Sequence, residues 1–241
     1  MEKAAYSPHP RISGNIILLV ILMLSIVMSI SVFFLYRPFS WPLGSESVES
    51  LVSVLLISFL TTILWMLRNR ILNERQKKNV IAGLYIGLLW TVEKSINNFI
   101  RPGLPLRDIV DNLFWGVIEL LILITAAYDV SKSGKFTDGI KSGFWTGLAS
   151  GAVACLSALL VIVFGMKFIL LDPLNIKEWT DLKATTNSPG MNVYFAYQTF
   201  AGAVGHLFIL GLLLGMIIGS LGGLLGKCFA KKSGSVGIYY M

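Results

Sequence analysis

Four ionisable side chains interrupt otherwise apolar stretches of this sequence, and they are its best candidates for chemistry: Glu93, Glu119, Lys167 and His206. A charged side chain in the middle of a membrane costs about 2.5–3.5 kcal/mol even on lenient insertion scales, so such groups face other helices or a water-filled cavity. Two carboxyl groups beside an imidazole can hold a proton or a cation, or form the polar end of a ligand pocket. The structural alternative is that each group hydrogen-bonds a neighbour and fixes helix packing.

Three amide side chains share helix faces with these groups. At about 3.6 residues per turn, residues that are four, seven or eight positions apart lie on one side of a helix. The pairs with such spacing are Asn97 with Glu93, Asn112 with Glu119, and Gln198 with His206. We expect these faces to meet in the outer half of a membrane, with Lys167 near the outer end of its own helix.

Sequence motifs of known enzyme classes are absent. No Walker A, GxSxG, HExxH or ExxH pattern occurs, and Cys155 and Cys228 have no metal-binding spacing. We therefore expect no catalytic residue, no bound metal and no enzymatic activity, and the sequence identifies no cofactor.

The elements that must carry these residues are membrane-spanning helices. Of the 241 residues, 55% are hydrophobic and 14% are charged, against about 45–50% and about 25% in an ordinary soluble domain. The apolar residues come in blocks long enough for spans of about 20 residues. We predict an all-α, polytopic integral membrane protein, with residues 1–241 forming one domain of six transmembrane helices. The expected spans cover residues 14–35, 48–67, 79–99, 109–127, 141–171 and 194–226.

The third expected span is the least apolar. Its uninterrupted apolar part runs only from Val80 to Val92, so a re-entrant segment is the alternative. Six spans place most Lys and Arg residues of the connections on the side of the N-terminus, in keeping with the positive-inside rule. We therefore expect both termini in the cytoplasm and a location in the inner or plasma membrane. The net charge of +7 does not indicate nucleic-acid binding, because the basic residues cluster at the ends of apolar segments.

Two ladders of glycine mark the last two expected spans. Each repeats at every fourth residue, which leaves a bare stripe along one side of a helix. The ladders are Gly139, Gly143, Gly147 and Gly151, and Gly211, Gly215, Gly219 and Gly223. Because a membrane gives no hydrophobic force between helices, small residues that let backbones approach are a main source of helix association. We predict a glycine-packed hairpin of the fifth and sixth spans; contact with another subunit and a flexible gating pair are the alternatives.

These features lead to two main hypotheses of different classes, and an intramembrane enzyme is a third that they support least. The first is a non-enzymatic membrane subunit or scaffold packed through the glycine ladders, whose partners are the lipid bilayer and either a second copy or other membrane subunits. The alternative is a small transporter or solute-binding membrane protein, with a polar site of Glu119, His206 and Glu93 in the outer half of the membrane. The long outer connection, residues 172–192, is expected to be a plain connection rather than a lid.

Overall fold

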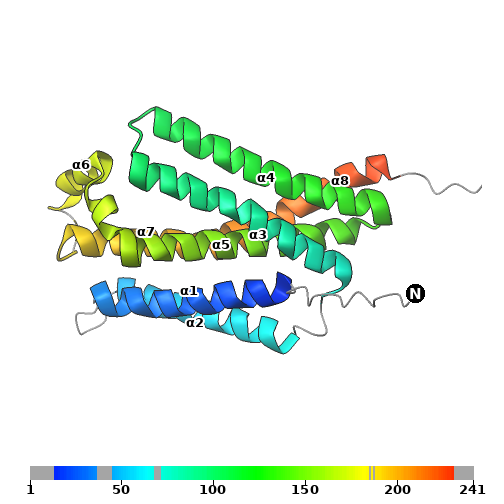
Figure 1. The fold of residues 1–241 in the computed structure, drawn as a ribbon, viewed down its shortest axis with the longest axis horizontal. Helices are drawn as coiled ribbons and strands as arrows, with labels where there is room; N and C mark the ends of the chain where they lie inside the picture. The colour runs from blue at the N-terminus through cyan, green and yellow to red at the C-terminus, as the bar shows by residue number, and fades with distance from the viewer. Residues whose placement is uncertain (1–13, 37–44, 68–71, 185, 187, 231–241) are drawn as a thin grey trace, which may run out of the picture.

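Long helices run side by side along the length of the molecule (Figure 1). The computed structural model describes residues 14–36, 45–67, 72–184, 186 and 188–230, and these residues form helices and connections without a strand. The elements are α1 (Gly14–Tyr36), α2 (Ser45–Leu67), α3 (Glu74–Ser95), η1 (Ile96–Ile100), α4 (Leu106–Ser133), α5 (Phe136–Leu170), α6 (Pro173–Leu182), α7 (Met191–Gly205), η2 (His206–Leu214) and α8 (Gly215–Phe229). The all-α prediction is confirmed. Both chain termini and the first part of the basic connection at residues 68–78 lie outside the described residues.

Five helices are long and apolar enough to cross a membrane, which confirms the prediction of a membrane-embedded helical protein. They are Gly14–Tyr36, Val48–Met66, Leu106–Ser133, Phe136–Leu170 and Met191–Phe229. The last is one continuous span that joins α7, η2 and α8. The segment expected as the third span is helical but is not among the five. Its first turns carry several charges, and Glu93 and Lys94 interrupt its apolar part.

Helix α5 forms the centre of the bundle. It packs against α1, α3, α4, α7, η2 and α8, and more than half of its 35 residues are buried. Its buried side chains are mostly small or branched aliphatic, as at Ala149, Ala152, Leu159 and Ile162. Such side chains let neighbouring helices approach closely, and the resulting van der Waals contacts stabilise helix association where lipid tails are as apolar as the protein.

The glycines of α5 face the backbone of η2 and α8. A Cβ atom built on Gly139 would lie 2.7 Å from Cα of Gly223, and one built on Gly151 would lie 2.5 Å from the carbonyl oxygen of His206. In the other direction, a Cβ atom on Gly219 would lie 2.6 Å from the carbonyl oxygen of Gly139. A side chain at these positions therefore meets backbone that cannot rotate away.

Helix α3 reaches α5 through glycines that the two ladders did not include. A Cβ atom on Gly87 would lie 2.6 Å from Cβ of Val153, and one on Gly83 would lie 2.8 Å from Cβ of Ala149. Sequence spacing places Gly83 on the same face as Glu93, and both are buried in the structure. The buried face of α3 therefore has bare glycines in its middle and polar side chains towards both ends, Gln76 and Asn79 at the first and Glu93 at the last.

A short helix occupies part of the connection at residues 172–192, for which a plain connection rather than a lid was expected. Helix α6 begins at Pro173, and the side chain of Asp172 accepts a hydrogen bond from the Leu174 amide at 3.0 Å. An Asp at the N-cap followed by Pro in the first turn is a known helix start signal. Helix α6 lies at the end of the bundle where η1 joins α4, opposite the end that α8 reaches (Figure 1). We call this end the α6 end.

A closed polar network ties the helices together near the opposite end. The Asn79 amide donates to the buried Asp129 carboxylate at 2.7 Å. The Arg75 guanidinium lies 3.9 Å from Asp129 and 2.8 Å from Asp138. These contacts join the first turns of α3 to the last turn of α4 and the first turn of α5.

Candidate functional site

A polar cavity of about 260 Å³ lies at the α6 end of the bundle. Its walls come from α3, η1, α4, α5, α6, α7 and the first residue of η2. The polar side chains that line it are Lys94, Asn97, Asn98, Arg107, Asn175, Gln198, Thr199 and His206. Among the described residues that line this cavity, the formally charged side chains are Lys94 and Arg107, and both are cations.

Two π-helical segments border the cavity. η1 contributes Asn97 and Asn98, and η2 begins at His206 in the middle of the α7–α8 span. A π-helical turn widens a helix and re-aims its side chains, and such segments are frequent at functional sites. The helix before η2 is also loosely packed, since a Cβ atom on Gly202 or Gly205 would meet nothing within 4 Å. No simple sequence pattern marks either π-helical segment.

A pair of carboxyl groups, from the buried Glu93 and the half-buried Asp111, lies beside Lys94. Glu93 is 3% exposed, and its Oε1 accepts a hydrogen bond from the Asn97 amide at 2.5 Å. The same amide nitrogen donates to Asp111 Oδ1 at 2.8 Å, so Asn97 bridges carboxylates of α3 and α4. Glu93 Oε2 lies 3.4 Å from Lys94 Nζ. Sequence spacing predicted that Asn112 would face α3, but Asn112 is exposed. Asp111, one position earlier, makes the hydrogen bond with Asn97 instead.

Arg107, the second cation that lines the cavity, also pairs with a buried carboxylate. Arg107 Nη1 lies 2.7 Å from Asp172 Oδ2, and Asp172 is 2% exposed. Because Asp172 also caps α6, this ion pair fastens α6 to the start of α4. A Lys has three N–H donors and an Arg has five, and each of these ion pairs engages a single nitrogen. Donors therefore remain for a ligand in the cavity.

His206 lies between this cavity and a smaller one. Its Nδ1 donates to the Gly202 carbonyl oxygen at 2.6 Å, so in the neutral ring Nε2 is an acceptor. Nε2 is buried and has no hydrogen-bond partner among the described residues. The ring contacts Trp90 at a centroid distance of 4.8 Å and Trp115 at 6.3 Å. Together with Glu119, these three side chains line the smaller cavity, of about 20 Å³.

The structure brings some predicted site residues together and separates others. Glu93 and Asn97 form one network, while Asn97, Gln198 and His206 line the polar cavity. Glu119 shares the smaller cavity with His206, and no hydrogen bond or ion pair reaches it from the described part of the chain.

Two predicted residues lie elsewhere. Asn112 is exposed on α4, and Lys167 is exposed on α5 with its Nζ 4.9 Å from the centre of the Phe168 ring. Sequence reasoning missed several contributors, namely Lys94, Asn98, Arg107, Asp111, Asp172 and Asn175. The Asp-Pro start of α6 was the available signal for the last two.

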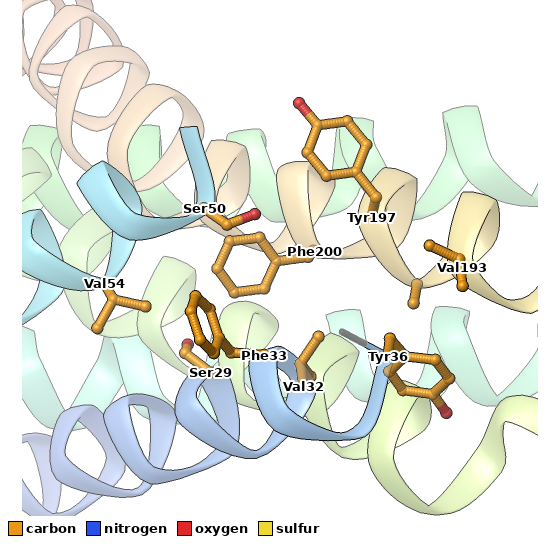
Figure 2. A pocket seen from close by; sticks show the side chains of 10 residues that line it. Ser29, Val32, Phe33, Tyr36, Ser50, Val54, Val193, Tyr197 and Phe200 are labelled. Carbon is orange, nitrogen blue, oxygen red and sulfur yellow. The ribbon is translucent and has the colours of Figure 1, made fainter. Parts of the chain in front are cut away.

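A third cavity, between α1, α2 and α7, is apolar and too small for a solute. It measures about 20 Å³, and Figure 2 shows Phe33 and Phe200 filling the space between the helices. The hydroxyl group of Tyr36 donates to the Ile162 carbonyl oxygen at 3.0 Å, and that of Tyr197 donates to Glu49. These contacts hold α1 and α2 against the bundle.

Comparison of the chain with known protein families, with curated proteins and with solved structures gave no match. Within the described ranges, no three His, Cys, Asp or Glu residues lie close enough to hold a metal ion. The polar cavity at the α6 end therefore carries the argument for function.

Proposed function

We propose that this protein is a multi-pass membrane protein that binds a small solute with a phosphate or carboxylate group in the polar cavity, as a binding protein or transporter. One observation carries the proposal. The charged side chains lining the cavity, in the part of the chain that the structure describes, are Lys94 and Arg107, while their carboxylate partners lie buried behind them. A ligand would therefore meet cationic N–H donors.

The remaining lining fits the same chemistry. The amide groups of Asn98, Asn175 and Gln198 each donate one hydrogen bond within the protein, which leaves a second N–H group and an oxygen to orient a ligand. Arg and Lys bind phosphate or carboxylate groups. Ligand pockets usually measure about 300–1,000 Å³, so a cavity of about 260 Å³ fits a small solute or a head group.

We further propose six spans, with α3 and η1 forming the third. Their 27 residues, Glu74–Ile100, lie along α5 beside the five apolar helices (Figure 1). Six spans put α6 and the cavity on the outer side, because the described connections at the opposite end carry Lys132 and Lys135 and the charged first turn of α3. The close approach of the ladder glycines supports a glycine-packed hairpin of α5 with η2 and α8 inside one chain.

Binding of sn-glycerol 3-phosphate to the purified protein tests the solute site. We expect saturable binding by isothermal titration calorimetry, weakened at least about tenfold in Lys94→Gln, which is the loss of one charge-assisted contact. The matched control is Lys132→Gln, an exposed lysine over the Tyr128 ring at the opposite end. Absence of saturable binding of both glycerol 3-phosphate and succinate, or equal binding by the two variants, would overturn the proposal.

A second candidate is a non-enzymatic subunit of a larger membrane assembly. The observation that favours it is the poor coverage of α2, whose apolar window is only 17% buried and which packs mainly on α1 and α7. That face is free for a second copy or another membrane subunit. Native mass spectrometry of the gently solubilised protein tests this, because a stoichiometric complex supports it and a bare monomer opposes it.

A further inference from the structure

We infer that the ligand of the polar cavity is an anionic lipid, whose head group occupies the cavity and whose acyl chain leaves sideways between α3 and α5. This inference rests on the proposed anion site and names its ligand class. Its basis is a cavity not yet described, which is mostly apolar, measures about 340 Å³ and lies between α3–η1 and α5. Lys94 and Val161 line both cavities, so the two cavities are neighbours on either side of these side chains.

The apolar cavity has the form of a bounded groove. One end is closed by a hydrogen bond between the hydroxyl groups of Thr91 and Ser157 at 2.7 Å, and the other by contact of the Phe99 and Phe168 rings, whose centroids are 4.7 Å apart. Gly165 lines it without a side chain. The α3–α5 interface thus passes from glycine contact at Gly87 to an open groove near the α6 end.

The groove opens toward lipid and not toward the bundle. Its lining residue Phe164 is 70% exposed on α5, a helix that is apolar enough to lie in the hydrocarbon region. Phe99 on η1 also lines the groove and is 56% exposed. Large exposed aromatic side chains around a groove are typical of sites that take an apolar ligand. An acyl chain can therefore enter from the membrane without passing through water.

Positive charge is concentrated where the head group would lie. Lys94 stands at the junction of groove and cavity. Lys167 Nζ lies 4.9 Å and the Arg101 guanidinium 5.9 Å from the centre of the Phe168 ring, at the α6 end of the groove. Of the nearby carboxylates, Glu93 and Asp172 are almost fully buried. Asp111 and Glu178 are half-buried and accept hydrogen bonds from the cavity-lining Asn97 and Gln198. A lipid with a negative head group is matched by this arrangement, whereas a neutral lipid is not.

The test compares two ligands that share one head group. sn-Glycerol 3-phosphate and 1-oleoyl lysophosphatidate are titrated onto the full-length protein in phosphatidylcholine nanodiscs, with neutral 1-oleoylglycerol as the control for partitioning. We expect lysophosphatidate to bind at least about 100-fold more tightly than glycerol 3-phosphate, a gain that burial of a few methylene groups supplies. We expect no saturable binding of oleoylglycerol.

Variants locate the acyl chain. Gly165→Leu should fill the groove and abolish the gain from the oleoyl chain while leaving glycerol 3-phosphate binding unchanged. Gly116→Leu, the same substitution at a site on α4 where a Cβ atom meets nothing within 4 Å, should keep the gain. Leu160→Trp fills the same groove from an exposed position and serves if Gly165→Leu does not fold.

The outcomes separate the two proposals. Equal affinity for the two phosphate ligands would overturn the lipid inference and leave the anion site standing. A chain-dependent gain that survives both groove-filling variants would overturn the groove as the binding place. If the wild-type protein binds neither ligand, both the anion site and the lipid inference are overturned.

Discussion

The two halves of this bundle are held together by different means. At the end of the bundle that lies opposite the α6 end, α5 and α8 are in backbone contact. A Cβ atom on Gly139 would lie 2.7 Å from Cα of Gly223. Near the α6 end, cavities of about 260 and 340 Å³ separate the same central helix from its neighbours. Helix packing in a membrane depends on close contact rather than on hydrophobic force. A half that is packed without gaps can therefore fix the fold while the other half stays open for a ligand.

The charged groups of the two halves also differ, in whether protein partners enclose them or they line a cavity. Asp129, near the opposite end, receives a hydrogen bond from Asn79 and faces Arg75, so it is enclosed by protein partners. At the α6 end, Lys94 and Arg107 turn toward a cavity and leave donors unused. The first arrangement stabilises helix packing, whereas the second is what a binding site needs.

The largest expected effect tests the close-packed half. A Cβ atom on Gly143 would lie 2.5 Å from Cα of Gly219, so Gly143→Leu forces α5 away from α8 and should cost at least about 3 kcal/mol of folding free energy. Gly116→Leu on the open face of α4 should change stability by less than about 0.5 kcal/mol. Thermal unfolding in detergent measures both, and equal stability of the two variants would contradict the close packing.

The next effect tests the closed polar network. Asn79→Ala removes a hydrogen bond to the buried Asp129 carboxylate, a loss of about 1.5–3 kcal/mol for a hydrogen bond to a charged group. Asn112→Ala makes the same change at an exposed site on α4 and should be nearly neutral. Chemical unfolding gives the stability difference, and glycerol 3-phosphate titration should show unchanged affinity in both variants. A fall in affinity would show that the two halves are coupled.

The elements of the fold were predictable from local pattern. Long apolar runs predicted helices such as Gly14–Tyr36, because in lipid a chain must satisfy its own backbone hydrogen bonds. Helix α6 was missed, because a ten-residue helix has no long apolar run and is marked only by Asp172 and Pro173. The π-helical segments were out of reach, since they depend on how neighbouring helices pack.

The site was predictable only in part, for a geometric reason. Spacing along one helix correctly placed Glu93 and Asn97 on a common buried face. It could not decide between Asp111 and Asn112, because the rotation of α4 against α3 sets which of two adjacent side chains points inward. Lys167 was expected among the polar groups by its depth alone, but it lies exposed on α5 beside Phe168. Depth in a membrane follows from the sequence, whereas direction depends on tertiary packing.

A smaller effect is expected at His206, in the half of the bundle that contains the cavities. His206→Ala should weaken glycerol 3-phosphate binding about tenfold, which corresponds to about 1.4 kcal/mol, because His206 lines the cavity and its Nε2 can accept a hydrogen bond from a hydroxyl group of this ligand. Its stability should change by less than about 1 kcal/mol, since Nε2 has no hydrogen-bond partner among the described residues and the Nδ1 bond stays within one helix turn. Calorimetric titration and thermal unfolding measure the two quantities. A stability loss as large as that of Asn79→Ala with unchanged binding would make His206 structural.

The smallest expected effect is at Glu119, and it decides whether the open half extends to the middle of the bundle. Glu119 has no ion-pair or hydrogen-bond partner among the described residues and lines the small cavity with His206. Glu119→Gln keeps the side-chain shape, and because no hydrogen-bond or ion-pair partner is lost, stability should fall by no more than about 0.5 kcal/mol. If the small cavity communicates with the anion site through His206, removing a negative charge should strengthen glycerol 3-phosphate binding about two- to threefold, because like charges near a ligand oppose it. Titration at low and high salt separates this from a change in fold, since screening reduces only the electrostatic part. Unchanged affinity at both salt concentrations would place the boundary of the binding half at His206.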